Sequence, residues 1–219
     1  MLLQTLREQI VQIGLRMVED GLAHGAQGNI SALDVETGLI AITPSAYPYY
    51  LRKAEDICVI DLQRNLIEGK WKPTSEIALH TIFYQKRKDV RAVVHSHAPN
   101  STVFGVIGEQ IPAVLTEAAF YLTGSVPVAP YACPGSDEVA EVTYAAMGEC
   151  GSAAVMAHHG LLTVGDNLEH AYETTLAAEM TARIVIMARS MGAKEIPLDP
   201  VEGAIFRIIR EYGLATRTR

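Results

Sequence analysis

The sequence has few cysteines, few aromatic residues and no excess of positive charge. Its three cysteines, Cys58, Cys133 and Cys150, are far apart and form no Cys-x-x-Cys pair, so they predict neither a disulfide framework nor a thiolate metal site. Asp and Glu number 25 against 18 Lys and Arg, for a net charge of −7. This balance argues against a nucleic-acid-binding surface. The cysteine content is typical of a reducing compartment, and we expect the protein to be cytoplasmic.

Long uninterrupted hydrophobic runs are also lacking. The N-terminal segment carries Arg7, Arg16 and Glu19 among its apolar residues, so it does not have the apolar core of a signal peptide. No other segment approaches the length of a membrane span. With 219 residues, 49% of them hydrophobic, the chain is long enough to bury the core of one domain. We expect that domain to cover residues 1–219.

Hydrophobic periodicity and turn residues predict a mixture of helices and short strands. Helices are expected over 2–22, 75–87, 136–148, 167–191 and 200–212, and strands over 38–43, 57–62, 91–97, 125–130, 152–157 and 160–165. We expect the hydroxyl of Ser75 to cap the second helix, and Asp166 with Glu169 to begin the fourth. The pattern predicts an α/β domain with helices on the faces of a central sheet, without determining its strand order.

Three histidines are candidate metal ligands. His95 and His97 are two residues apart in a predicted strand, so their imidazoles project from the same face. His159 follows another apolar strand, and we expect Gly160 to let the backbone bend around an ion there. Three neutral imidazoles with an open position suit zinc or another divalent first-row metal in a catalytic site. The alternative is a set of core or loop histidines with ordinary hydrogen bonds.

Three turns of small residues could bind an anion. Residues 25–31 read Gly-Ala-Gln-Gly-Asn-Ile-Ser, and their backbone amides could surround an anion. Residues 43–46 read Thr-Pro-Ser-Ala after a predicted strand. Residues 73–76 read Pro-Thr-Ser-Glu and place two hydroxyls and a carboxylate at a helix N-terminus. Each segment taken alone is more commonly an ordinary turn or helix cap.

The order of these segments is more specific than any one of them. Gly-Asn-Ile-Ser, Ile-Thr-Pro-Ser, Pro-Thr-Ser-Glu, Val-Val-His-Ser-His-Ala and His-His-Gly-Leu follow one another along the chain. Together they resemble the class II aldolase and adducin-head family, and within it the fuculose phosphate aldolases. The resemblance covers nearly the whole chain. It implies a mostly antiparallel sheet flanked by helices, an α+β arrangement, and a homotetramer with active sites between neighbouring subunits.

The resemblance also implies roles for individual residues. His95, His97 and His159 would hold one divalent metal beside Glu76, with zinc expected first and manganese, iron or cobalt as alternatives. Glu76 would be the acid/base carboxylate. Tyr212 would contribute to the neighbouring subunit's site, or else only pack the last helix. The residues that match the family's phosphate cradle are Gly28, Asn29, Ser45, Ala46, Thr74 and Ser75.

The sequence departs from the family pattern at three positions. Ala26 stands where a hydroxyl residue is frequent, and Ala46 stands where glycine is frequent, so phosphorylation of the substrate is left open. Thr116 falls where fuculose phosphate aldolases use a tyrosine at the aldehyde end, which predicts a different aldehyde. Glu117 beside it is either a polar pocket residue or an ordinary acid at the start of a helix.

The expected reaction is reversible, metal-dependent cleavage of a ketose 1-phosphate to dihydroxyacetone phosphate and a small aldehyde. The metal would act as a Lewis acid on the ketose oxygens, and Glu76 would exchange a proton with the resulting enediolate. Alternatives with the same metal site are a dehydratase, a decarboxylase or a 4-epimerase acting on a phosphorylated sugar or sugar acid, although the epimerases carry Asp at the position of Glu76. A non-enzymatic module like the adducin head would be expected to lack the metal ligands.

Overall fold

One mixed sheet organises the protein. The structure, a computed structural model, describes residues 1–116, 118–199, 204–205 and 208–209. Within this part of the chain, the strand order is β4-β3-β2-β1-β5-β8-β7-β6. All neighbouring strands are antiparallel except the parallel pair of β6 and β7. The strands are β1 (Asn29–Asp34), β2 (Leu39–Ile42), β3 (Cys58–Ile60), β4 (Leu66–Glu68), β5 (Ala92–Ser96), β6 (Val128–Ala129), β7 (Ala153–Met156) and β8 (Gly160–Gly165).

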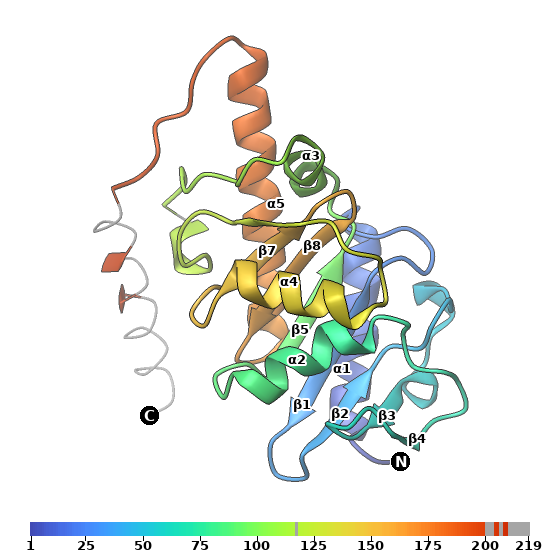
Figure 1. Cartoon of the computed structure of the whole chain (residues 1–219). Helices are drawn as coiled ribbons and strands as arrows, with labels where there is room; N and C mark the ends of the chain where they lie inside the picture. The colour runs from blue at the N-terminus through green and yellow to red at the C-terminus, as the bar shows by residue number, and fades with distance from the viewer. Residues whose placement is uncertain (117, 200–203, 206–207, 210–219) are drawn as a thin grey trace.

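Helices cover both faces of this sheet. They are α1 (Gln4–Glu19), α2 (Ile77–Lys86), α3 (Pro99–Ile107), α4 (Asp137–Met147) and α5 (Leu168–Ser190). In Figure 1, α2 and α4 lie in front of the sheet, and α1 and α5 lie behind it. Each face has its own apolar core. Val94 of β5 packs into the core beneath α1 and α5, and Val93 packs into the core beneath α2 and α4, because successive strand side chains point to opposite faces.

The expected sheet, mostly antiparallel with helices on its faces, is confirmed. Among the strands and α-helices, three were not expected, namely β1, which falls partly in the segment interpreted as a glycine turn, β4 and α3. Polar residues near the start of α3 favour its N-terminal turn but not its interior. The carboxylate of Glu179 on α5 accepts hydrogen bonds from the amides and side chains of Asn100 and Ser101. A residue nearly 80 positions away in the sequence thus stabilises the start of α3.

Both predicted helix starts were wrong by one residue. The N-cap position of α2 is Glu76, whose side chain makes no cap bond. The Glu76 amide instead donates to the hydroxyl of Thr74 at 3.3 Å. The cap of α5 is Asn167, whose side chain accepts from the amide of His170 at 2.8 Å. The helix expected over 200–212 falls largely outside the described residues, as do Tyr212 and Glu117.

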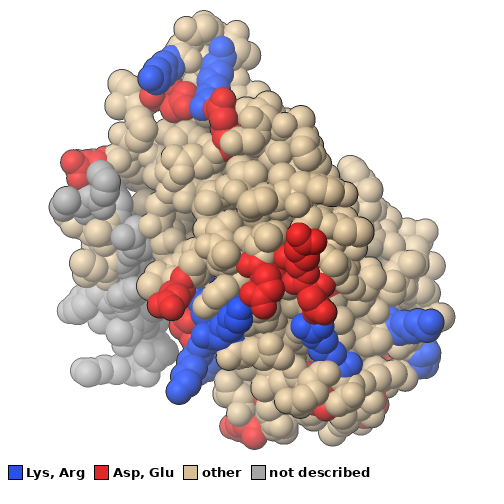
Figure 2. All heavy atoms as spheres, viewed as in Figure 1, with Lys and Arg blue, Asp and Glu red and all other residues tan. Residues whose placement is uncertain are grey.

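The surface carries charge of both signs. On the face shown in Figure 2, basic and acidic side chains lie beside one another in mixed groups. Two pairs of this kind are Lys86 with Glu141 at 2.8 Å and Arg64 with Asp137 at 2.5 Å. Among the helices that the structure describes, none is long and apolar enough to cross a membrane.

Candidate metal centre and active site

The antiparallel pairing of β5 and β8 brings the three predicted histidines together. His95 lies on β5 with no exposed surface, and His97 follows the end of that strand. His159 immediately precedes β8, whose Leu161 is paired with Ser96. One ring nitrogen from each histidine lies within 4.8 Å of those of the other two. The expected convergence of the imidazoles is therefore present in the geometry.

Two glycines allow the backbone to pass close to these histidines. A Cβ on Gly160 would lie 2.4 Å from the carbonyl oxygen of Ser96 and 3.1 Å from Cε1 of His95. A Cβ on Gly28 would lie 2.5 Å from the carbonyl oxygen of His95. The expectation that Gly160 bends the backbone was wrong, because the left-handed residue in that turn is His158, at φ 56°. Gly160 is needed for close packing instead.

His95 has the chemistry of a metal ligand. Its Nδ1 lies 3.0 Å from the carbonyl oxygen of Leu161, which can only accept, so Nδ1 carries the proton. Burial lowers the pKa of His95 to about 4, so the ring is neutral near pH 7 and Nε2 bears a lone pair. That Nε2 is buried and has no hydrogen-bond partner among the described residues. Burial and the neighbouring His159 also lower the pKa of His97, which favours its neutral form.

Glu76 lies against the histidine cluster. Its Oε2 is 3.3 Å from Nε2 of His95, and its Oε1 is 3.4 Å from Nε2 of His159. Burial raises the pKa of Glu76, but attraction to any proton on the neighbouring histidines, together with the hydrogen bond from the side-chain amide of Asn29, outweighs it and keeps that pKa below its ordinary value. The ionised carboxylate and the lone pair of His95 are both acceptors and would repel at this distance. A divalent cation bound between them would remove that repulsion, so the donor set fits a metal.

The three small-residue turns meet beside this cluster. They line a cavity of about 200 Å³ together with Glu76, His97, His159 and Pro134. All six residues predicted for the phosphate cradle are among its lining: Gly28, Asn29, Ser45, Ala46, Thr74 and Ser75. Sequence reasoning missed Pro134, because nothing in the local pattern connects its loop to turns that lie more than 50 residues earlier. It also missed His80, which lies behind Asn29 and is taken up below.

Some amides of this cavity are already used within the fold. The amide of Ser45 donates to the carbonyl of Lys72 at 2.9 Å, and that of Thr74 donates to the carbonyl of Thr43 at 3.0 Å. These bonds fix the second and third turns against each other. The side chains of Ser45 and Ser75 are exposed at the cavity, so their hydroxyls are its natural anion donors.

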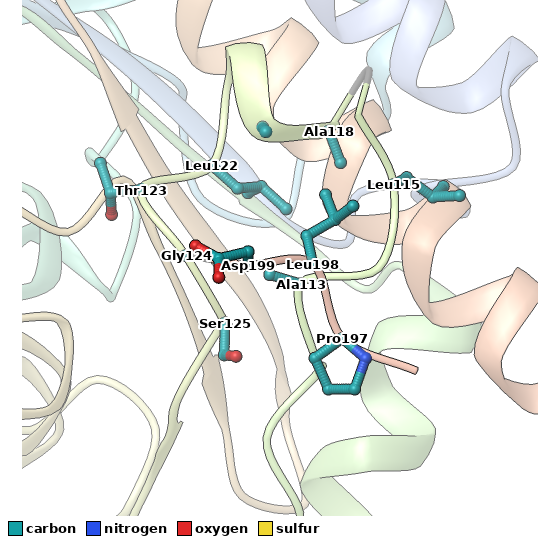
Figure 3. A pocket seen from close by; sticks show the side chains of 11 residues that line it. Ala113, Leu115, Ala118, Leu122, Thr123, Gly124, Ser125, Pro197, Leu198 and Asp199 are labelled. Carbon is teal, nitrogen blue, oxygen red and sulfur yellow. The ribbon is translucent and has the colours of Figure 1, made fainter. Parts of the chain in front are cut away.

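A second cavity lies away from the histidines. This space has a volume of about 240 Å³ and lies between the segments 113–115 and 118–125 and the segment 197–199 (Figure 3). Leu115, Leu122 and Leu198 make much of its wall apolar. Among the residues that the structure describes, none of those predicted for catalysis, metal binding or phosphate binding lines it.

Comparison with known proteins places the chain in a family. The model of the class II aldolase and adducin N-terminal domain matches residues 8–186. The chain belongs to the class II aldolase and adducin family. The family resemblance drawn from the sequence is confirmed, and so is the assignment to class II aldolase enzymes.

Individual members of the family differ in the reactions for which they are named. A 5-deoxy-D-ribulose 1-phosphate aldolase of Bacillus thuringiensis is 38% identical over 92% of this chain and 94% of its own. An L-ribulose-5-phosphate 4-epimerase of Salmonella paratyphi B is 29% identical over 90% of this chain and 91% of its own. The solved structure of an L-fuculose 1-phosphate aldolase superposes with a TM-score of 0.90 at 33% identity, covering 94% of this chain and 96% of that one. Class II aldolases depend on a divalent metal, and the three clustered histidines could bind one.

Proposed function

We propose that this class II aldolase cleaves a ketose 1-phosphate reversibly into dihydroxyacetone phosphate and a small aldehyde. The observation that carries the proposal is the position of Glu76. Its two carboxylate oxygens lie 3.3 and 3.4 Å from ring nitrogens of His95 and His159, at the wall of a cavity lined by small, hydroxyl-bearing turns. A carboxylate beside a metal site and a polar cavity is the arrangement that proton transfer to a metal-held sugar requires.

His95, His97 and His159 would hold the divalent cation, with zinc expected first and Glu76 beside them. When bound, the cation supplies Lewis acidity to the ketose oxygens as negative charge develops on them. Membership of the class II aldolases, which depend on a divalent metal, supports the need for such an ion. Its identity and the tetramer expected from the resemblance remain part of the proposal. The contribution expected from Tyr212 likewise remains a prediction.

The two oxygens of Glu76 are not equivalent. Oε2 accepts a hydrogen bond from the side-chain amide of Asn29 at 2.8 Å. Oε1 is buried and without a hydrogen-bond partner in the described part of the chain. We therefore assign proton transfer to Oε1. In synthesis it would remove a proton from C3. In cleavage the proton that leaves O4 of the ketose as the C3–C4 bond breaks would protonate the carboxylate, which would then deliver a proton to C3.

The cavity would bind the phosphate through the hydroxyls of Ser45 and Ser75 and through the turn containing Gly28. Its small lining residues, Ala26 and Ala46 among them, leave room for an anion at the mouth. The relative named for 5-deoxy-D-ribulose 1-phosphate makes that compound the first substrate to try. Its aldehyde product differs from that of fuculose 1-phosphate, as Thr116 in place of a tyrosine predicts.

The second candidate is a different reaction at the same metal site, on a phosphorylated sugar or sugar acid. The epimerase relative supports a 4-epimerase, and the notion of a dehydratase or decarboxylase rests on the family alone. Both reactions would use the same metal site, so product analysis separates them better than metal content does.

The test is a panel of ketose 1-phosphates, namely fuculose, ribulose and 5-deoxyribulose 1-phosphates, assayed with metal-loaded protein. Release of dihydroxyacetone phosphate is followed by coupled reduction, with a chelated sample as the control. We expect chelator-sensitive release, fastest for one of the smaller sugars. Metal-loaded protein that releases nothing from any of the three, but interconverts pentulose 5-phosphates, would transfer the assignment to the epimerase.

A further inference from the structure

Behind the carboxylate of Glu76 runs a buried row of polar side chains that the reaction does not by itself require. We call Asn29, His80, Ser31 and Tyr84 the Asn29–Tyr84 chain. Oδ1 of Asn29 lies 2.5 Å from Nε2 of His80, and Nδ1 of His80 lies 2.7 Å from the hydroxyl of Ser31. That hydroxyl lies 2.6 Å from the hydroxyl of Tyr84. His80 and Ser31 have no exposed surface.

The chain alternates between a strand and a helix whose spacings match. Asn29 and Ser31 are two apart on β1, which spaces them by about 6.6 Å on one face. Glu76, His80 and Tyr84 are four apart along α2, which spaces them by about 6 Å on one side of the helix. The side chains of β1 and α2 therefore alternate along the row, each one hydrogen-bonded to the next. Because Asn29 is paired with His95 in the sheet, the row ends at the metal centre.

The ionised carboxylate fixes the direction of every bond. Oε2 of Glu76 can only accept, so Nδ2 of Asn29 must face it and Oδ1 must face His80. His80 then donates from Nε2 and accepts at Nδ1 from Ser31, which leaves Tyr84 to donate to Ser31. Burial lowers the pKa of His80 to about 3, so the neutral ring that this pattern needs is the stable form near pH 7.

We propose that His80 is a positioning residue, which fixes the side-chain amide of Asn29 so that Glu76 is held by Oε2 and presents Oε1 to the substrate. The inference rests on the proposed role of Glu76. The chain serves orientation rather than proton conduction, because a carboxamide donates and accepts hydrogen bonds but does not readily pass a proton on. Without His80, Asn29 can rotate its carbonyl toward the carboxylate, where two acceptors repel and Oε1 loses its orientation.

The main experiment compares His80→Leu with His80→Gln in the metal-loaded protein. Gln keeps an N–H donor near the place of Nε2, whereas Leu removes it. We expect His80→Leu to lower kcat by about 10- to 100-fold, as supporting groups around metal sites do when removed. KM and the metal content should stay close to wild type, and His80→Gln should recover most of the loss.

Thr175→Val is the matched control. Thr175 is also fully buried and hydrogen-bonded, but it lies on α5 at the opposite face of the sheet. The Thr175→Val variant should be less stable than the wild-type protein but have the same kcat. Equal losses of kcat in His80→Leu and His80→Gln, or a loss explained by lower metal content, would overturn the proposal. So would a kcat in His80→Leu equal to that of wild type.

A second measurement does not depend on folding of the Leu variant or on knowing the substrate. Long-range ¹H–¹⁵N correlation spectra of the wild-type, metal-loaded protein should show His80 as the neutral Nε2–H tautomer. Ser31→Ala should shift the Asn29 side-chain amide resonances. An Nδ1–H tautomer would overturn the inference outright. If no sugar is cleaved but the expected tautomer and shift are seen, the proposed reaction fails while the hydrogen-bond chain stands.

Discussion

Two groups of buried hydroxyls and amides, one on each face of the same sheet, end in different ways. Beneath α5, the hydroxyls of Thr163 and Thr175 bond to each other at 2.7 Å, and the hydroxyl of Thr163 donates to the carbonyl of Ala171 at 2.9 Å. This group closes on itself. Beneath α2, the Asn29–Tyr84 chain continues into Glu76 and stops at Oε1, which lacks a hydrogen-bond partner in the described structure. Nε2 of His95 beside it has none there either.

The difference separates polar groups that serve packing from those that serve chemistry. Buried polar atoms are nearly always hydrogen-bonded, because an unpaired one costs about 1–3 kcal/mol. A group that closes on itself meets this requirement and needs nothing else. A group that leaves a carboxylate oxygen and an imidazole nitrogen unpaired, 3.3–3.4 Å from their neighbours, would be completed by the proposed cation and substrate. We call the face beneath α2 the open side and the face beneath α5 the closed side. Substitutions on the two sides should therefore affect different measurements.

The largest expected effect is that of Glu76→Gln on the open side. Gln retains an acceptor for the Asn29 amide but cannot exchange a proton, so kcat should fall by about 10²- to 10⁴-fold, the usual contribution of an acid/base group. The metal content, measured by elemental analysis, should remain near one ion per subunit. Full activity in a variant that holds its metal would remove the carboxylate from the mechanism.

The open side should also determine how the stability of the metal-free protein depends on pH. Burial lowers the pKa of His95 to about 4 and that of His80 to about 3, from ordinary values of 6.5. Both rings stay neutral in the fold, while the unfolded chain takes up their protons below pH 6.5. Stability is thus complete above about pH 6.5 and falls as the pH drops toward 4, by at most about 1.4 kcal/mol per pH unit for each histidine.

Urea unfolding with a chelator at several pH values between 7.5 and 5 would measure this dependence. His80→Gln should reduce the slope by one histidine's share, whereas Thr175→Val should leave it unchanged. A free energy of unfolding that is constant across this range would contradict the assignment of two neutral buried rings.

On the closed side, Thr175→Val should affect stability alone. The substitution removes one hydroxyl, while Thr163 keeps its bond to the carbonyl of Ala171 at 2.9 Å. The free energy of unfolding should fall by about 1 kcal/mol, the net value of one buried hydrogen bond. Steady-state assays should give kcat and KM within error of wild type. A fall in kcat would mean that the two faces are coupled and that the comparison is too simple.

How far the sequence predicts this molecule follows from how local each signal is. Strand alternation is local, so the shared face of His95 and His97 could be foreseen. The expected sheet and the three turns were recognisable for the same reason, together with their order along the chain. Helix α3 was missed, since its start is fixed by Glu179 on α5. The cap of α2 was misplaced by one residue because propensity does not distinguish adjacent positions in a turn of Thr, Ser and Glu.

The Asn29–Tyr84 chain was missed for a different reason. Its members alternate between β1 and α2, which lie about 50 residues apart in sequence, as in Asn29 and His80. The signal was present as spacing, with steps of two in the strand and steps of four in the helix. That spacing becomes informative only when the two elements are known to pack face to face, so nothing in the sequence singled out His80.

The smallest expected effect distinguishes two turns of the cavity rather than two faces of the sheet. Ala46 is left-handed at φ 52°, whereas Ala26 in the first turn is not. A Cβ in that conformation costs about 1–2 kcal/mol, and the greater freedom of unfolded glycine offsets about 0.4–1 kcal/mol of the gain from removing it. Ala46→Gly should therefore stabilise the protein by about 0.5–1 kcal/mol in urea unfolding.

Ala26→Gly, the matched control, should destabilise the protein by a similar amount, since only the entropic cost applies there. A stabilisation by both substitutions would show that flexibility of the cavity, and not the strain at Ala46, decides the stability of these turns.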